Sequence, residues 1–269
     1  MHPIINAATR ISVLMYHRVG ISHNEWEARY AISPVLFAAH MHHLASKGFR
    51  AISIDSLVDW LEGGLDLPDR AILVTFDDGF RGVYDHALPV LEDLGWPFTV
   101  FLVSDLIGKE DIWTRSENPD GKTYPLLDKV QILDMQRRGV SFQSHTRSHT
   151  KLPTLNETQL ADQLTGSRLS LSALLEQDVQ YLAYPFGHLD DRVERATRTA
   201  GYRAAFSTQP GFNRRDMNLF RIRRIDVYGT DSRGMLLRKI TYGSNNGGIG
   251  QSFSYYLNRV KARIAGAVR

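Results

Sequence analysis

The stretch that most constrains this chain is residues 71–79, AILVTFDDG, an uncharged and mostly apolar run that stops at two carboxylates and a glycine. Such a run predicts a strand buried on both faces of a parallel sheet. Adjacent carboxylates at its end repel each other, and a bound cation or a shared proton is the usual compensation. Successive strand side chains point to opposite sides, so Asp77 and Asp78 are expected to differ in role. A helix N-cap is the alternative, but it needs only one aspartate.

Strands and helices alternate along the rest of the chain, which predicts βα units and a parallel sheet. Seven or eight strands favour a closed or nearly closed barrel of one domain over residues 1–269, with reactive residues at the carboxyl ends of the strands. Thr154 and Glu157 have the spacing of a capping box for one of the helices. The expected strands are 11–16, 49–54, 71–76, 98–103, 140–143, 179–184, 204–207 and 222–227, and the expected helices are 33–48, 55–61, 83–94, 126–138 and one that follows Thr154.

Composition excludes several classes of protein. The formal net charge is only +3 over 269 residues, without a long basic run, which disfavours nucleic-acid binding. There are no cysteines, so neither a disulfide framework nor a thiolate metal site is available. No stretch approaches the roughly twenty apolar residues of a membrane span, and the start does not resemble a signal peptide. We therefore expect a cytoplasmic protein, with a basic helical tail at about 250–269 that packs on the barrel.

A second informative segment, 144–149, reads SHTRSH and follows the expected strand 140–143. Two imidazoles four residues apart share one face of a helical turn, which is a common way to hold a metal. His145, His149 and one aspartate would form a three-ligand site with an open position, as a catalytic zinc ion requires. Solvated or capping histidines are the alternative reading.

Two further strand ends carry candidate groups. The segment 184–187, YPFG, predicts a tight turn that can present the backbone N–H of Phe186 to an oxyanion, or simply a turn that ends a strand. His17 follows the first strand, where a lone histidine is more often a structural residue. The histidines at 40, 42 and 43 lie on an expected helix, and we expect them to be solvated.

The segments TFDDG at 75–79 and HTRSH at 145–149 resemble the first two signature motifs of the polysaccharide deacetylases, the NodB-homology or carbohydrate esterase family 4 domain. The resemblance covers roughly residues 10–230 and implies a distorted (β/α) barrel. It implies that Asp77 is the catalytic base. It also implies that Asp78, His145 and His149 hold Zn²⁺ or another divalent cation.

The third motif of that family is usually R-x-P-[FY], but here it reads Ala183-Tyr184-Pro185-Phe186, and no later L-x-H supplies the usual acid histidine. The segment LMYHRV at 14–19 and the YPFG turn instead resemble the subset similar to the deacetylases of biofilm poly-N-acetylglucosamine. That resemblance makes His17 the general acid. Arg223 or Arg224 would replace the missing arginine, with Arg224 as the candidate, and Tyr184 and Pro185 would contact substrate.

The implied reaction is metal-assisted removal of N-acetyl groups from amino sugars of a polysaccharide, oligosaccharide or glycan precursor. Trp113, in the polar segment 105–122, is the tryptophan best placed to stack on a sugar. A deformylase or a small cyclic-amide hydrolase on the same scaffold is one alternative. A non-catalytic carbohydrate-binding module is another, although it should lack the base or a metal ligand. Oligomeric state is left open.

Overall fold

A computed structural model describes residues 8–248, so the predicted tail at about 250–269 lies outside the described residues. Eight parallel strands form the main sheet in the order β10-β1-β5-β6-β7-β8-β9, and the short β4 pairs with the first residues of β5. These strands are β1 (Ser12–Tyr16), β4 (Arg50–Ala51), β5 (Ala71–Phe76), β6 (Thr99–Leu102), β7 (Ser141–Ser144), β8 (Tyr181–Ala183), β9 (Ala204–Phe206) and β10 (Ile225–Asp226).

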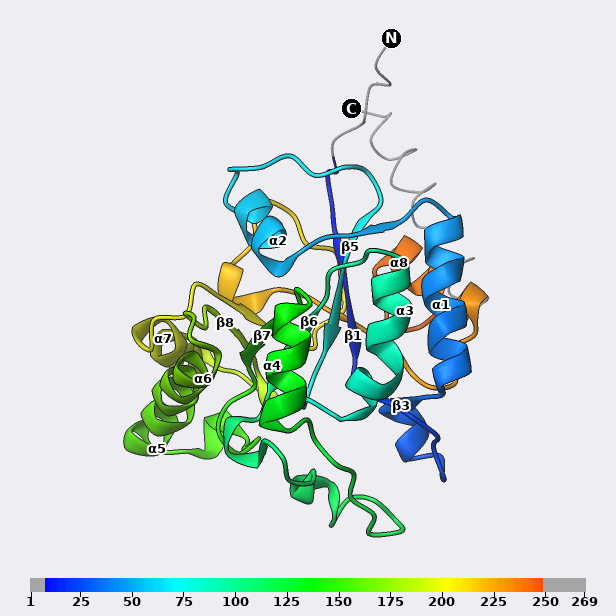
Figure 1. The fold of residues 1–269 in the computed structure, drawn as a ribbon. Coiled ribbons are helices and arrows are strands. Elements are labelled where there is room, and N and C mark those ends of the chain that lie inside the picture. The colour runs from blue at the N-terminus through cyan, green and yellow to red at the C-terminus, as the bar shows by residue number, and fades with distance from the viewer. Residues whose placement is uncertain (1–7, 249–269) are drawn as a thin grey trace.

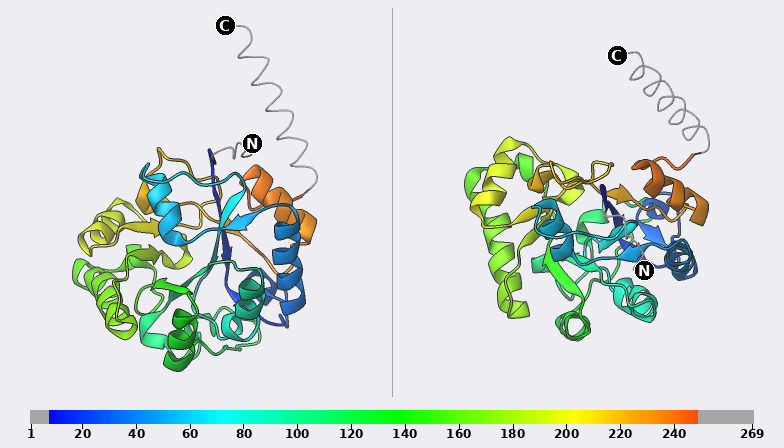
Figure 2. Two further views of the ribbon diagram at one scale, coloured as in Figure 1. Left: turned by 45° about the horizontal axis from the view of Figure 1, so that its top comes forward. Right: turned by 90° about the horizontal axis from the view of Figure 1, so that it is seen from above.

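The sheet curls into the distorted (β/α) barrel that the sequence predicts, with helices around it (Figures 1 and 2). Its ends approach through the segment 222–226, because Phe206 of β9 bridges to Ile222 while β10 pairs with β1. The helices are α1 (Pro34–Ser46), α2 (Ile54–Leu61), α3 (Leu88–Asp93), α4 (Lys129–Arg137), α5 (Glu157–Ala161), α6 (Ser167–Leu175), α7 (Asp191–Thr199) and α8 (Arg233–Tyr242).

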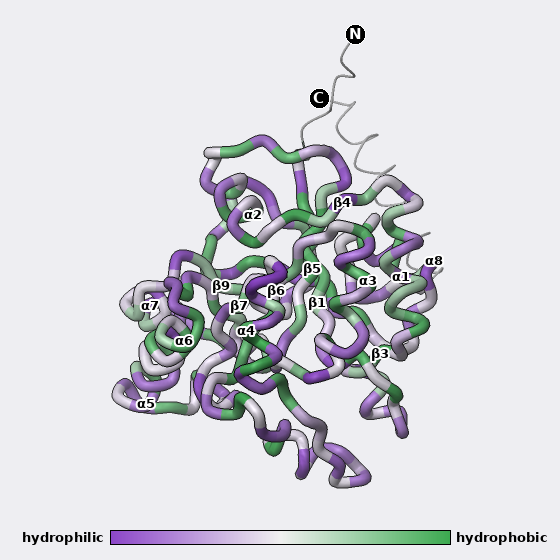
Figure 3. Tube along the Cα trace, viewed as in Figure 1, coloured by the Kyte–Doolittle hydropathy of each residue, from purple (hydrophilic) through white to green (hydrophobic). Residues whose placement is uncertain are grey.

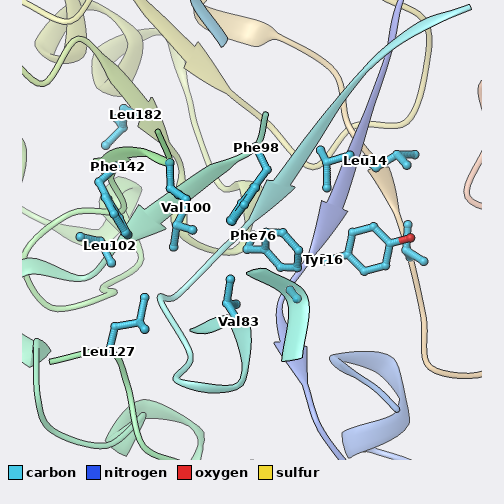
Figure 4. Packing of buried hydrophobic residues seen from close by; sticks show 14 of the residues in the cluster. Leu14, Tyr16, Phe76, Val83, Phe98, Val100, Leu102, Leu127, Phe142 and Leu182 are labelled. Carbon is cyan, nitrogen blue, oxygen red and sulfur yellow. The ribbon is translucent and has the colours of Figure 1, made fainter. Parts of the chain in front are cut away.

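Alternate residues of each strand enter two different hydrophobic clusters, as the two-residue strand period requires. Leu14, Val74 and Phe76 belong to the larger cluster beneath the surrounding helices, part of which is shown in Figure 4. Val13 and Leu73 belong to the second cluster, which also contains the buried residues of α2. The strands are therefore buried on both faces, and polar side chains gather where the strands end.

A small sheet of β2 (Arg18–Val19) and β3 (Ala31–Ile32) follows β1, at the end where the strands of the main sheet finish. The segment between β6 and α4 extends from the same end, at the bottom of Figures 1 and 3, and is mostly hydrophilic. The irregular excursion predicted for residues 105–122 is thus confirmed, with short turns at Ser104–Leu106 and Ile112–Thr114. The carboxyl end of the barrel therefore carries two added loops.

Several local expectations were wrong. The capping box is made by Asn156 and Gln159, because Thr154 lies in a short turn with Pro153 and bonds to the Lys151 carbonyl. His40 is fully buried, since its Nε2 donates to the Asp231 carbonyl at 2.7 Å and its Nδ1 faces the Tyr16 hydroxyl. Helices α7 and α8 were not predicted at all.

Candidate active site

A cavity of about 880 Å³ lies at the carboxyl ends of the strands. Asp77 and Asp78 reach it from the end of β5, and His145 and His149 from the loop after β7. Its remaining lining comes mostly from the end of β1 and the loops that follow it, the excursion after β6, the turn after β8 and the end of β10, with single residues after β5, β7 and β9. These residues are Met15, His17, Arg18, Glu25, Trp26, Glu27, Ala28, Arg29, Tyr30, Phe80, Asp111, Trp113, Thr114, Glu117, Tyr124, Lys151, Phe186, His188, Thr208, Asp226, Val227, Tyr228 and Thr230.

The turn after β5 is tight because Asp78 and Gly79 both have left-handed backbone angles, with φ of 72° and 78°. Aspartate tolerates this region better than most residues. A Cβ at position 79 would come within 2.7 Å of the Leu102 side chain, so the close approach to β6 requires glycine. The turn thereby presents both carboxylates at the floor of the cavity.

Asp78, His145 and His149 form a compact three-residue group, with one potential ligand atom from each within 4.8 Å of the others. Oδ1 of Asp78 lies 3.4 Å from Nε2 of His145 and 3.3 Å from Nε2 of His149. Nδ1 of His145 faces the Ala183 carbonyl at 2.7 Å, so it must carry the proton, and this leaves the Nε2 lone pair free. Oδ1 of Asp78 is buried without a hydrogen bond among the described residues.

The pKa shifts in this group agree with a charged Asp78 carboxylate, and they have opposite directions in the two imidazoles. Burial opposes the ionisation of Asp78, yet the neighbouring imidazoles of His149 and His145 hold its pKa far below the ordinary value. Burial lowers the pKa of His149 to about 3. His145 is different, since Asp77 and Asp78 overcome the effect of burial and raise its pKa.

Asp77 lies beside this group but takes a different partner. Arg224 donates two hydrogen bonds to its carboxylate, Nη1 to Oδ1 at 2.6 Å and Nη2 to Oδ2 at 2.7 Å. The Arg224 side chain is fully buried, and its Nε also donates to the Ser207 carbonyl at 3.0 Å. Against the opposing effect of burial, Arg224 and His145 lower the pKa of Asp77. Arg223 points elsewhere, to the Pro210 carbonyl.

His17 lines the cavity at the end of β1, with the edge of its ring against Tyr30 at a centroid distance of 5.5 Å. Its Nδ1 is buried without a hydrogen bond among residues 8–248. Asp226, at the end of β10, lines the same cavity, and burial raises its pKa while His17 and Arg224 oppose that effect. The structure thus brings His17 to the two aspartates and two histidines.

Two aromatic residues lie against His149. Trp113 stacks on the imidazole with a centroid distance of 4.4 Å and an interplanar angle of 27°, and Phe186 meets it edge-on at 4.6 Å. Phe186 has a left-handed backbone with φ of 58°, so the turn after β8 is sharp, as expected. Both residues line the cavity.

Three expectations about local geometry need correction. The Tyr184 side chain is fully buried in the hydrophobic core and does not line the cavity, and Pro185 is likewise buried outside the lining. Position 184 continues the alternation of β8, since Leu182 and Tyr184 belong to the larger hydrophobic cluster and Ala183 to the second. The segment 145–149 is an irregular turn with left-handed residues at Thr146 and His149, so the two imidazoles converge without a helix.

Sequence reasoning missed Asp226, Glu27, Asp111, Tyr124 and Tyr228, all of which line the cavity. Asp226 carries the same signal as Asp77, a carboxylate at a strand end, but the strand was predicted to run on to residue 227. Asp111 accepts hydrogen bonds from Thr114 Oγ1 and the Tyr124 amide, and burial raises its pKa to about 6. No sequence pattern marks these loop residues.

The fold and the site together define an α/β barrel with an Asp-His-His group and a second, arginine-paired aspartate at the carboxyl ends of its strands. The family model described as polysaccharide deacetylase matches residues 64–205. The chain therefore belongs to the polysaccharide deacetylase family.

Individual relatives agree with this assignment. A protein of Staphylococcus epidermidis named poly-beta-1,6-N-acetyl-D-glucosamine N-deacetylase is 26% identical over 207 residues, which cover 74% of this chain and 68% of that protein. The structure of IcaB from Ammonifex degensii superposes with a TM-score of 0.69 and 28% identity, covering 82% of this chain and 93% of that one. The Streptococcus pyogenes deacetylase PplD, solved with acetate, has a TM-score of 0.74 at 22% identity, covering 86% and 98%, and is similar in fold.

Proposed function

We propose that this chain is a metal-dependent N-deacetylase that hydrolyses the acetamido groups of amino sugars in a glycan. The observation that carries the proposal is the convergence of Asp78, His145 and His149 within 4.8 Å, next to an aspartate held by Arg224. A non-catalytic module would have no use for this combination. Family membership supports the same reaction.

The donor set fits a divalent cation such as Zn²⁺. Two imidazole nitrogens and one carboxylate are the ligands of many catalytic zinc sites, which keep an open position. The buried Oδ1 of Asp78 has no hydrogen bond among the described residues. Histidines that bind a metal usually donate their other ring N–H to a carbonyl or carboxylate, and the hydrogen bond from His145 Nδ1 to the Ala183 carbonyl orients Nε2 in this way. Asp78, His145 and His149 would hold the ion.

Once bound, a divalent cation polarises the acetyl carbonyl and lowers the pKa of water at the site to about 7. Asp77, ionised because of Arg224, accepts the proton of the attacking water. The backbone N–H of Phe186 supports the oxyanion of the tetrahedral intermediate. His17 donates a proton to the sugar amine as the C–N bond breaks, and acetate leaves.

The relative from Staphylococcus epidermidis makes β-1,6-linked poly-N-acetylglucosamine the first polymer to test. Trp113, half-buried on one wall of the cavity, supplies an apolar face for a sugar ring. Among residues 8–248, no helix has the length and apolarity needed to cross a membrane. We propose that the substrate belongs to an exopolysaccharide.

The direct test measures acetate release from N-acetylglucosamine oligomers with β-1,6 and β-1,4 linkages, with the metal present and after chelation. We expect release that chelation abolishes and that added Zn²⁺ restores. Release that survives complete removal of metal would overturn the metal dependence. Metal-dependent hydrolysis of formamido sugars or cyclic amides alone would overturn the N-acetyl assignment.

A further inference from the structure

Two loops that are far apart in the sequence meet at the carboxylate of Glu27, on one side of the cavity. Glu27 lies in the loop after β2 and is only 2% exposed. Arg18 Nη2 and the His23 amide donate to its Oε2 at 2.9 and 2.8 Å. From the excursion after β6, the Tyr124 hydroxyl and the Asn118 amide donate to its Oε1 at 2.6 and 3.1 Å. We call this group, Arg18, Glu27, Asn118 and Tyr124, the loop junction.

The loop junction gives a role to Arg18, which the motif LMYHRV contains and which the reaction does not use. The Arg18 guanidinium lies 3.5 Å from the centroid of the Tyr124 ring as well as on Glu27. Both charges of the pair are buried, so each depends on the other. Burial alone would raise the pKa of Glu27, but its hydrogen bonds from Tyr124, His23 and Asn118 hold the pKa below the ordinary value. Glu27 therefore remains a charged acceptor at neutral pH.

A continuous set of contacts leads from the loop junction to the metal-ligand candidates. Tyr124 and Asp111 are joined by two hydrogen bonds. The Tyr124 amide donates to the Asp111 carboxylate, and the Asp111 amide donates to the Tyr124 carbonyl at 3.1 Å. Asp111 also accepts the Thr114 hydroxyl and so fixes the turn Ile112–Thr114. Trp113 projects from that turn onto His149.

We propose that Glu27 is a positioning residue that docks the excursion of residues 109–125 onto β2 and the loop after it, and thereby holds Trp113 as a wall of the substrate cavity. The proposal rests on the deacetylase function above. Asp77 takes its two hydrogen bonds from Arg224, and His145 makes its own to the Ala183 carbonyl, so neither of these contacts involves the loop junction. The loop junction therefore acts on how the glycan is held, through Trp113, while Asp77 and His145 keep their own hydrogen bonds.

Glu27→Gln tests this with little change of shape. Glutamine keeps an acceptor for Tyr124 and Asn118, but its NH₂ group would face the Arg18 and His23 donors. We expect KM for the oligosaccharide to rise about tenfold while kcat stays within about twofold, the pattern of lost ground-state binding. Hydrogen exchange should become faster in residues 20–30 and 111–124 together, and metal content should not change.

The matched control is Glu92→Gln, which removes the charge that pairs with Arg138 between α3 and α4, outside the cavity lining. It should leave KM and the exchange of both loops as in the native chain. If Glu27→Gln does not fold, Tyr124→Phe replaces it as the test. This change removes only the phenol hydroxyl, and we expect it to raise KM and to speed up hydrogen exchange in both loops.

Unchanged KM in a folded Glu27→Gln protein, with or without a lower Tm, would overturn the proposal. Faster exchange in only one of the two loops would overturn it as well, because the junction would then not couple them. A native chain that releases no acetate from any N-acetylated glycan is a failure of the proposed function, and the exchange measurement still decides whether Glu27 holds the loops together.

Discussion

The guanidinium of Arg224 donates two parallel hydrogen bonds of 2.6 and 2.7 Å to the carboxylate of Asp77, although the two residues are 147 positions apart in the chain. Both side chains are buried. Asp77 directly follows β5 and Arg224 directly precedes β10, and β1 lies between these two strands. Such forked pairs are rigid and strongly directional. Arg224 thus fixes the orientation of Asp77 and keeps it ionised, which a proton acceptor at neutral pH requires.

Loss of Arg224 should therefore affect stability and catalysis together. Arg224→Ala leaves the buried Asp77 charge without a partner, for which we expect a loss of about 3–5 kcal/mol in the free energy of unfolding. The pKa of Asp77 should rise, which moves the acid limb of kcat/KM to higher pH. Urea unfolding and a pH–rate profile measure the two effects. Arg223→Ala is the control, since the Arg223 side chain donates to the Pro210 carbonyl and not to Asp77, and we expect it to change neither quantity.

Removal of a metal ligand should abolish the rise in Tm that we expect when Zn²⁺ is added to the native chain. A ligand at 100 times its Kd stabilises the folded state by about 2.7 kcal/mol, so Zn²⁺ should raise the Tm of the native chain. His149→Ala should lose that response, because one of three ligand candidates is gone. His42→Ala, an exposed histidine of α1, should keep it. A rise in Tm of the same size in His149→Ala would show that the ion binds elsewhere.

The proposed acid, His17, should matter only when the leaving group needs a proton. We expect His17→Ala to lower kcat on N-acetyl glycans by about 10²–10⁴, the usual contribution of general acid catalysis. Hydrolysis of 4-nitrophenyl acetate should fall much less, because nitrophenolate leaves unprotonated. His23→Ala, an exposed histidine of the same loop, is the control. Equal losses on amide and ester would remove His17 from the role of acid.

The pH dependence of stability should report on Glu194. Hydrogen bonds from Asn218, Arg221 and Arg198 outweigh the effect of burial and lower its pKa from 4.5 to about 2. A depressed pKa stabilises the fold above the unfolded value and loses that effect as pH falls from 4.5 towards 2. Glu194→Gln should lower the free energy of unfolding at pH 7 and flatten its decline in this range, measured by urea titration. An unchanged decline in Glu194→Gln would show that Glu194 does not cause the loss of stability in this pH range. The control is Glu157→Gln, which removes one partner of an exposed ion pair and should leave the decline as in the native chain.

Much of the barrel could be predicted from the sequence, because its strands are short apolar runs that stop at polar residues. The segments at Phe76, Ser144 and Ala183 all end close to their predicted positions, and this placed Asp77, Asp78, His145, His149 and Phe186 at one end of the fold. Helix α7 was missed because most of its residues are charged or polar, and its inward face is made of Val193, the small Ala196 and the polar Thr197.

The rest of the site depends on contacts between distant segments. Of the two successive arginines before β10, Arg224 faces Asp77 and Arg223 faces the Pro210 carbonyl, and no local sequence pattern specifies which one faces the site. Tyr184 enters the core because it continues the alternation of β8, on the same side as Leu182, and the short apolar run did not show which side faces the cavity. The loop junction has no sequence signature, because Glu27 is bonded to residues that lie 91 and 97 positions further along the chain, Asn118 and Tyr124.

The most direct test of the account compares metal content and acetate release for the native chain and Asp77→Asn. Asparagine has the shape of aspartate but cannot accept the proton, and Asp78, His145 and His149 remain as ligands. We predict about one divalent ion per chain in both proteins and a fall in kcat of about 10²–10⁴ or more in the variant. Acetate release at the native rate by Asp77→Asn, or a native chain that binds no metal, would contradict the account.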